Sequence, residues 1–303
     1  MKIIGFLQNF NGVGNGDLKR CLESMQVVVD DIFVYDDAST EETKALYDEY
    51  GCTVIYGLKN QFSKELHHKS QLLKALLSVH PDCDWICWYD SDAVLGSFFD
   101  DREAVNAALE RVSEAGLVQV YLHNTNLWRS ETHYRSDIEY DNLWHCVFWR
   151  NTGELHYDPS SGLHQKQFPI PFYQREGEEV KVGAIKFQEE TQRLIHYGFA
   201  TLDRVLAKYF TYKREGQTGY PLDRLVSETG MLMDKPVEMT LHEMDLDWYP
   251  ASCRPDGMSP VPEPTLTPEM VGEYKNLEEA LYGSDENLQH LQAPTEESDT
   301  GKS

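Results

Sequence analysis

The chain has 303 residues, which is enough for one large α/β domain with an appendage. Its 51 acidic and 27 basic side chains give a formal net charge of −24, which argues against nucleic acid and anionic membranes as partners. A small phosphate-containing ligand is still compatible with this charge, because a metal ion, helix amino termini and a few local cations can neutralise a phosphate.

The cysteines and the hydropathy indicate where in the cell the protein is located. The six cysteines form no C-x-x-C pair, and several lie in apolar segments, which is typical of reduced thiols. The opening run Met1–Leu7 is too short for a secretory signal, and no stretch approaches the length of a membrane span. We therefore expect a soluble, cytoplasmic protein without a transmembrane segment.

The first half of the chain alternates short β-type runs with amphipathic helical segments, which is typical of βαβ units on a mostly parallel sheet. Ser39 and Glu42 have capping-box spacing before a helix that Gly51 would end, and an apolar face at 66–77 predicts a further helix. We predict a doubly wound, Rossmann-like α/β sheet flanked by helices. Its expected strands are Ile3–Leu7, Ile32–Tyr35, Thr53–Tyr56, Trp85–Tyr89 and Leu117–Leu122.

The second half is less regular. Residues 124–181 are rich in Trp, Tyr, His and Arg without a clear period, which is typical of an ordered loop that carries a binding surface. A helical pattern returns at Phe187–Lys213, and from Arg254 the chain is acidic and contains several prolines. We expect one domain at 1–253, divided into halves at 1–123 and 124–253, and a flexible acidic tail at 254–303.

Pairs of carboxylates follow two of the expected strands. The run Trp85–Tyr89 ends in Asp90-Ser91-Asp92, and adjacent carboxylates repel each other unless a cation lies between them. Asp36 and Asp37 end the second strand, and the carboxyl ends of parallel strands meet at the edge where α/β proteins bind ligands. The pattern favours a nucleotide-diphosphate site with a divalent metal over ordinary solvated turns, which Asp and Ser also form.

A competing interpretation uses the glycines after the first strand. Gly12-Val13-Gly14-Asn15-Gly16 is similar to a dinucleotide-binding fingerprint, with Asp36 near the distance expected for a ribose-binding acid. Asp17 stands where the third glycine of the fingerprint belongs, and an NAD enzyme has no need for two carboxylates after the fourth strand. We rank an NAD-dependent oxidoreductase below the nucleotide-diphosphate site.

These motifs resemble a known family. Three segments are similar to the donor half of family 2 glycosyltransferases of the GT-A fold, namely Phe6–Asn11, Val34–Ser39 and Trp88–Asp92. Four later segments resemble the branch with a Gly-x-x-His-Glu motif and a later His-Tyr-Gly motif, namely Tyr134–Asp137, Val147–Arg150, Gly162–His164 and Ile195–Phe199. The resemblance implies metal-dependent transfer of a sugar from a nucleotide-diphosphate sugar to an acceptor hydroxyl, with inversion.

The resemblance places the donor in the first half of the chain. It implies that Asn9 lies in the donor site and that Asp36 and Asp37 contact the nucleoside. Lys69 would lie near the donor phosphates, and the alternative is a solvent-exposed helix lysine.

The resemblance also implies a metal site. Asp90, Ser91 and Asp92 would flank the ribose and diphosphate, and Asp90, Asp92 and His196 would bind Mn²⁺ or Mg²⁺. The alternative for His196 is a half-buried histidine at a helix end.

The general base is an open assignment. The family motif would supply a Glu, and Gln165, which cannot take a proton, stands in its place. An inverting transfer needs a base for the acceptor hydroxyl, for which we expect His164 first, then Asp137 and Asp158. A non-catalytic binder of nucleotide-sugars or glycans and a sugar nucleotidyltransferase stay open as alternatives.

The acceptor of the implied transfer stays open among a glycan, a lipid-linked saccharide and a protein. Aromatic rings in the irregular segment either stack on its sugars or belong to the core, and these rings are Trp128, Tyr134, Trp144 and Trp149.

Overall fold

The structure is a computed structural model of the whole chain, and it describes residues 1–14, 16–61, 64–137, 140–153, 155–157, 169, 183–214, 240–262, 272 and 276. The chain forms two compact units, one of residues 1–201 with 240–262 and one of residues 202–239 with 263–303. The described part of the second unit is helix α5 (Leu202–Arg214), with Gly272 and Asn276. No helix in the described ranges is long and apolar enough to cross a membrane.

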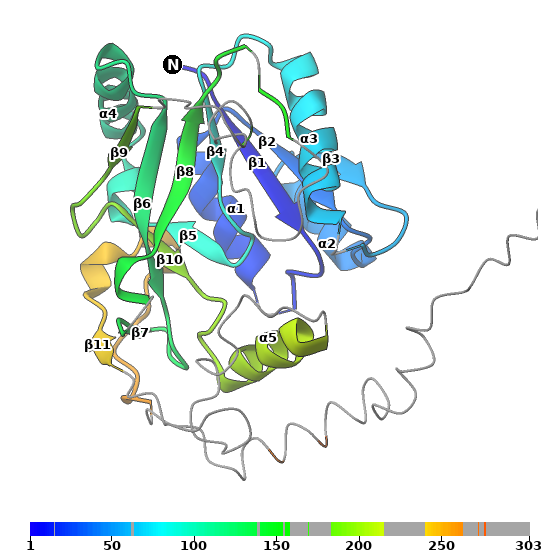
Figure 1. The fold of residues 1–303 in the computed structure, drawn as a ribbon. Coiled ribbons are helices and arrows are strands. Elements are labelled where there is room, and N and C mark those ends of the chain that lie inside the picture. The colour runs from blue at the N-terminus through cyan, green and yellow to red at the C-terminus, as the bar shows by residue number, and fades with distance from the viewer. Residues whose placement is uncertain are drawn as a thin grey trace, which may run out of the picture. The chain divides into compact units, whose positions relative to one another are not determined.

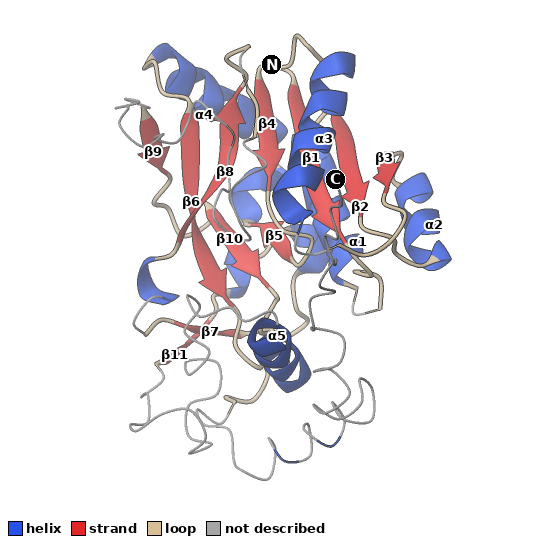
Figure 2. Cartoon of the chain, turned by 45° about the vertical axis from the view of Figure 1, so that its right-hand side comes forward, coloured by secondary structure: helices blue, strands red, loops and turns tan. Residues whose placement is uncertain are grey.

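A large mixed sheet dominates the first unit (Figure 1). In the described residues, nine strands form this sheet in the order β3-β2-β1-β4-β8-β6-β10-β5, with β9 beside β6, while β7 and β11 pair separately. Figure 2 shows β6, β8, β4, β1, β2 and β3 side by side. The strands are β1 (Ile3–Asn9), β2 (Asp31–Asp36), β3 (Thr53–Tyr56), β4 (Trp85–Trp88), β5 (Ala93–Leu95), β6 (Gln119–Asn126), β7 (His133–Arg135), β8 (Trp144–Arg150), β9 (Ala184–Lys186), β10 (Arg193–His196) and β11 (Leu241–Glu243).

Helices cover both faces of this sheet, because successive strand residues point to opposite sides. Leu7 of β1 belongs to a core cluster with α1 (Asp17–Val28) and α4 (Arg102–Glu114). Its neighbour Phe6 belongs to a second cluster with α3 (Glu65–Val79), while α2 (Glu41–Glu49) packs with α1 through Tyr47. The doubly wound α/β architecture expected from the sequence is therefore confirmed.

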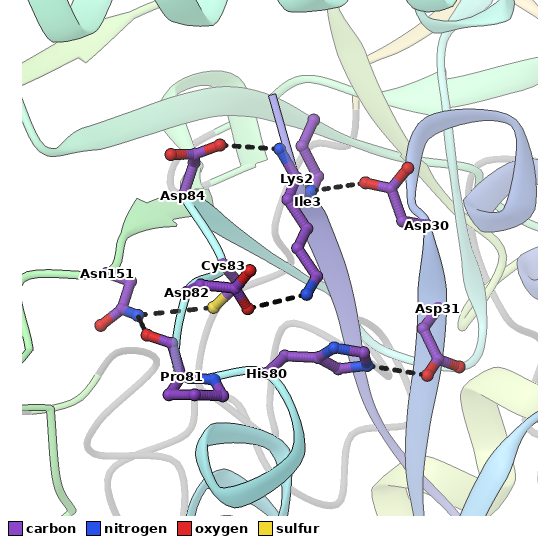
Figure 3. A network of polar contacts seen from close by, with 10 residues as sticks. All are labelled: Lys2, Ile3, Asp30, Asp31, His80, Pro81, Asp82, Cys83, Asp84 and Asn151. Carbon is purple, nitrogen blue, oxygen red and sulfur yellow. Dashed lines mark hydrogen bonds and ion pairs between the residues drawn. The ribbon is translucent and has the colours of Figure 1, made fainter.

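The amino end of β1 is closed by side chains (Figure 3). The N–H of Lys2 donates to Asp84 at 2.7 Å, and the N–H of Ile3 donates to Asp30 at 2.7 Å. Backbone donors at this edge are thus satisfied within the chain.

The carboxyl ends of the strands form the opposite edge. β1 lies between β2 and β4, with Asn9 in register with Asp36 and Phe6 in register with Trp88. The chain leaves β1 toward one side and later returns to its other side, and such a switch point opens a crevice at the carboxyl ends of the strands. The two pairs of aspartates follow strands on either side of β1, at this edge.

The five expected strands and the expected helix at 66–77 are all present. Two expectations for the second half were wrong. The segment 124–181, expected to be irregular, contains β7 and the central strand β8, and Phe187–Lys213, expected to be helical, contains β10. β10 is four residues long and gains its hydrogen bonds from β6 and β5, so a window over its own sequence does not reveal it.

The expected capping box is also absent. The residue before α2 is Thr40, which makes no side-chain cap, while the Ser39 hydroxyl accepts from the N–H of Asn11 at 2.9 Å. Gly51 follows α2 with a φ of +64°, as expected of a residue that ends a helix.

Candidate functional site

Asp36, at the end of β2, is fully buried and holds a turn. Its Oδ1 accepts from the N–H of Ser39 and its Oδ2 from the hydroxyl of Tyr47, each at 2.8 Å. Tyr47 in turn accepts from the side-chain amide of Asn9 at 2.7 Å. Burial and the Asp36 carboxylate raise the pKa of Tyr47 far above its usual value, so its proton stays in place. Asp36 therefore shapes the strand end and presents no exposed oxygen to a ligand.

Asp37 lies next to this turn and is held from the connection between β3 and α3. Both of its carboxylate oxygens accept from the N–H of Gln61, at 3.0 and 2.9 Å, and Oδ2 also accepts from Asn60 at 3.0 Å. Beside it the ring of Tyr35 stacks on His68, with centroids 4.2 Å apart and planes 11° apart. Burial lowers the pKa of His68 although the Asp37 carboxylate opposes this, so the imidazole is neutral at pH 7.

Asp90, Ser91 and Asp92 form the turn between β4 and β5. The carbonyl of Asp90 accepts from the N–H of Ala93 at 3.0 Å, and the carbonyl of Asp92 accepts from the N–H of Tyr197 at 2.7 Å. The side chain of Asp90 is exposed, and that of Asp92 is one quarter exposed. The turn thus presents both carboxylates at the carboxyl edge of the sheet.

Pairing of β10 with β5 brings His196 to this turn, since His196 is in register with Ala93. Its Nε2 lies 3.2 Å from Oδ2 of Asp92, and its Nδ1 lies 2.7 Å from Oδ1 of Asn126. An amide oxygen only accepts, so Nδ1 carries a proton, and in the neutral ring the Nε2 lone pair faces a carboxylate oxygen. Two facing lone pairs repel each other, and a proton or a metal cation between them relieves the repulsion.

The donor set fits a divalent cation. Carboxylate oxygen and imidazole nitrogen together suit Mn²⁺, whereas Mg²⁺ prefers oxygen ligands throughout. Within the described ranges, no group of three His, Cys, Asp or Glu side chains could hold a metal ion. A cation at Asp92 and His196 would therefore take its remaining ligands from water or from a bound phosphate.

Lys69 on α3 is buried, so the alternative of a solvent-exposed helix lysine is wrong. Its Nζ donates to Glu65 at 2.6 Å and lies 4.2 Å from the ring centroid of Trp88, the last residue of β4. A cation held against an aromatic face is stabilised by the electron density of the ring. Lys69 thus lies between the Glu65 carboxylate and Trp88, and Trp88 precedes Asp90 by two residues.

His145 on β8 was missed by the sequence analysis. Its imidazole stacks on Trp88 with centroids 4.8 Å apart, and its buried Nε2 makes no hydrogen bond to any residue that the structure describes. Burial lowers its pKa to about 4. A histidine inside the apolar run Trp144–Trp149 was the available signal. The charges acting on it are those of Asp90, Lys69, His196 and Asp92, so it lies among the candidate residues.

Asp137, a candidate base, is paired with the buried Arg135. Nε of Arg135 lies 3.0 and 2.8 Å from its two carboxylate oxygens, and a further guanidinium nitrogen lies 2.8 Å from Oδ1. The N–H of Thr240 donates to Oδ2 at 2.9 Å. These bonds occupy the lone pairs that a general base would use, which favours a positioning role.

The other base candidates, His164 and Asp158, lie outside the described residues, as does Gln165. Of the four aromatic candidates, Trp128 and Trp149 are buried core residues. Tyr134 and Trp144 are half-buried. Lys186 lies over the Trp144 ring at 4.4 Å, so one ring face is already covered.

The glycine-rich loop before α1 is a tight turn. A Cβ on Gly12 would lie 2.5 Å from Oδ1 of Asn9, and Gly16 has a φ of +76°. Asp17, at the third glycine position of the fingerprint, is buried and paired with Arg20 at 2.7 Å. Gly12 and Gly16 therefore have structural reasons to be glycine that require no dinucleotide.

No protein-family model matches the chain, and no curated protein matches it. Among solved structures it is similar to TarS of S. aureus, with 10% identity over 74% of this chain and 41% of that chain, at a TM-score of 0.43. A mannosyltransferase from Pyrobaculum calidifontis, in complex with GDP-Man and Mn²⁺, has 15% identity over 40% of this chain and 35% of that chain, at a TM-score of 0.30.

Glucosyl-3-phosphoglycerate synthase from Mycobacterium tuberculosis, in complex with Mn²⁺ and UDP-glucose, has 16% identity over 42% of this chain and 44% of that chain, at a TM-score of 0.26. The chain thus spans less than half the length of these structures. Identities and TM-scores this low carry no conclusion about activity.

Proposed function

We propose that the protein is a metal-dependent glycosyltransferase that moves a sugar from a nucleotide-diphosphate sugar to an acceptor hydroxyl, with inversion. The observation that carries the proposal is the pairing of Asp92 with His196 at 3.2 Å, at the edge where Asp37 and Asp90 also lie. Carboxylates and an imidazole at the carboxyl ends of parallel strands suit a cation that binds a diphosphate.

The proposal assigns a role to each candidate site residue named below. Asp92 and His196 would hold Mn²⁺, with its remaining ligands from water or the bound diphosphate and with the exposed Asp90 carboxylate in the same turn. The cation would stabilise the charge of a departing nucleoside diphosphate. Lys69, held between Glu65 and Trp88, would lie near the donor phosphates. Asp37 would accept from the nucleoside, while Asp36 holds the turn that presents it.

The base in this proposal comes from outside the described residues. Asp137 is engaged by Arg135, so removal of the acceptor proton is assigned to His164, with Asp158 as the second candidate. The acceptor is a hydroxyl of a glycan, a lipid-linked saccharide or a protein.

The first test is a thermal-shift panel of UDP-, GDP- and dTDP-sugars and of NAD(H), each with and without Mn²⁺. A ligand that binds only the folded state raises the melting temperature. The proposal requires a manganese-dependent shift with one nucleotide-sugar, followed by detection of sugar transfer or nucleoside diphosphate release. A shift with NAD(H) alone would replace it with an oxidoreductase, and binding without turnover would leave a nucleotide-sugar binder.

The matched variant is Asp92→Asn, which keeps the side-chain shape and removes the charge. We expect it to abolish the manganese-dependent part of the shift, because the amide oxygen is a weaker ligand for Mn²⁺. Asp84→Asn, at the opposite edge of the sheet, is the control for loss of one surface charge. An unchanged manganese dependence in Asp92→Asn would refute the metal assignment.

A further inference from the structure

Asn126, the last residue of β6, is buried beside the candidate metal site. Only 2% of its surface is exposed, and pairing of β6 with β10 puts it in register with His196. Its side-chain oxygen lies 2.7 Å from Nδ1 of His196. Asn126 therefore makes a polar contact with the imidazole on the side away from Asp92.

The orientation of the Asn126 amide is fixed by the strand itself. Its Nδ2 donates to the backbone carbonyl of Asn124 at 3.4 Å. A flipped amide would point its oxygen at that carbonyl and its NH₂ group at Nδ1 of His196. The oxygen–oxygen contact is repulsive, so the observed orientation is the favoured one.

This orientation selects one imidazole tautomer. Because Oδ1 of Asn126 only accepts, the hydrogen bond requires the proton of neutral His196 to be on Nδ1. The lone pair is then on Nε2, the nitrogen 3.2 Å from Asp92. The ring of Phe199 meets the imidazole edge-on, with centroids 5.3 Å apart and planes 81° apart, and restrains its tilt.

We propose that Asn126 is a positioning residue for the binding of a divalent cation. It sets the tautomer and the ring orientation of His196, so that the Nε2 lone pair and the Asp92 carboxylate face the same cation position. The inference rests on the proposed function, since it assumes that Asp92 and His196 bind the cation. Partners of this kind on the far side of a metal-binding histidine fix its ring and raise its basicity as a ligand.

The test compares Mn²⁺ binding, by electron paramagnetic resonance titration, in the wild type and three variants. Asn126→Leu keeps the branched side-chain shape and removes the acceptor, and we expect Mn²⁺ affinity to fall about 10- to 100-fold. Asn126→Asp keeps an acceptor and should retain wild-type affinity or bind more tightly. Thr125→Val is the control, because it removes a buried hydroxyl from the same strand without touching His196.

A second readout does not depend on the metal. In ¹⁵N NMR of the metal-free protein, His196 should be the Nδ1–H tautomer in the wild type and in Asn126→Asp, and a mixture of tautomers in Asn126→Leu. Thermal melting of each variant checks that it is folded. If Asn126→Leu does not fold, the tautomer and Mn²⁺ affinity of Asn126→Asp test the role of Asn126.

The outcomes separate the two proposals. If the wild type binds no Mn²⁺, and His196→Ala changes nothing, the metal site of the proposed function fails and this inference fails with it. If the wild type binds Mn²⁺ and Asn126→Leu binds it equally well with an unchanged tautomer, only the role of Asn126 is overturned.

Discussion

Replacing His145 by leucine should remove an acid-sensitive element of the fold. The imidazole is buried against Trp88, and burial lowers its pKa from 6.5 to about 4, although the Asp90 carboxylate opposes this. The unfolded chain therefore takes up a proton near pH 6.5, while the folded chain does so only near pH 4. Stability associated with His145 is intact above pH 6.5 and is lost as the pH falls toward 4.

The size of the effect follows from proton linkage. Between about pH 7 and about pH 5, the two pKa values correspond to a loss of about 2 kcal/mol in the free energy of unfolding. At neutral pH the Leu variant should be at least as stable as the wild type, because Nε2 has no hydrogen-bond partner among the described residues and a buried nitrogen left so costs roughly 1–3 kcal/mol. Loss of the ring stacking on Trp88 offsets about 0.5–1.5 kcal/mol of that gain.

The assay is urea unfolding at a series of pH values, followed by circular dichroism for the wild type and His145→Leu. The difference in unfolding free energy between the two proteins should change by about 2 kcal/mol between about pH 7 and about pH 5. The contributions of carboxylates that both proteins share cancel in this difference. If the unfolding free energies of the two proteins depend on pH in the same way, the argument that burial keeps His145 neutral is refuted. If the proposed sugar transfer is lost in a variant that stays stable, His145 has a role beyond stability.

Two other substitutions test the description of the site. Asp137→Asn should destabilise the fold by about 3 kcal/mol in urea unfolding, because it removes a carboxylate charge that is paired with the buried guanidinium of Arg135. If this variant keeps wild-type stability and loses transfer, the carboxylate is catalytic instead. Gly12→Ala should cost about 1–3 kcal/mol, since its Cβ would lie 2.5 Å from Asn9, whereas Gly14→Ala, with open space around it, serves as control. Equal melting temperatures for the two alanine variants would contradict this packing argument.

The sequence by itself determined the first half of the fold. The strands at 3–7, 32–35, 53–56 and 85–89 were predictable because each is a short β-branched or aromatic run bounded by turn residues, and helices with clear apolar faces separate them. This alternation also placed Asp36, Asp37, Asp90 and Asp92 at one edge, because parallel strands joined by helices end on the same side.

The sequence also indicated candidate site residues, but not whether their side chains are buried or paired. Lys69 was expected near the site, and only the structure shows it buried between Glu65 and Trp88. Asp137 was a candidate base by position, and only the structure shows that Arg135 engages it. Burial and pairing depend on side chains brought from other elements, which local pattern does not contain.

Only the tertiary structure shows how the candidate metal ligands Asp92 and His196 come together. Asp92 and His196 are more than a hundred residues apart, and β10 reads as part of a helix until its pairing with β5 and β6 is known. Asn126 and His145 carried no motif, and they reach the site because β6 and β8 cross the middle of the sheet. Local periodicity specifies helices and parallel strands, whereas the partners of a short strand are set by the burial and hydrogen bonds that the whole sheet offers it.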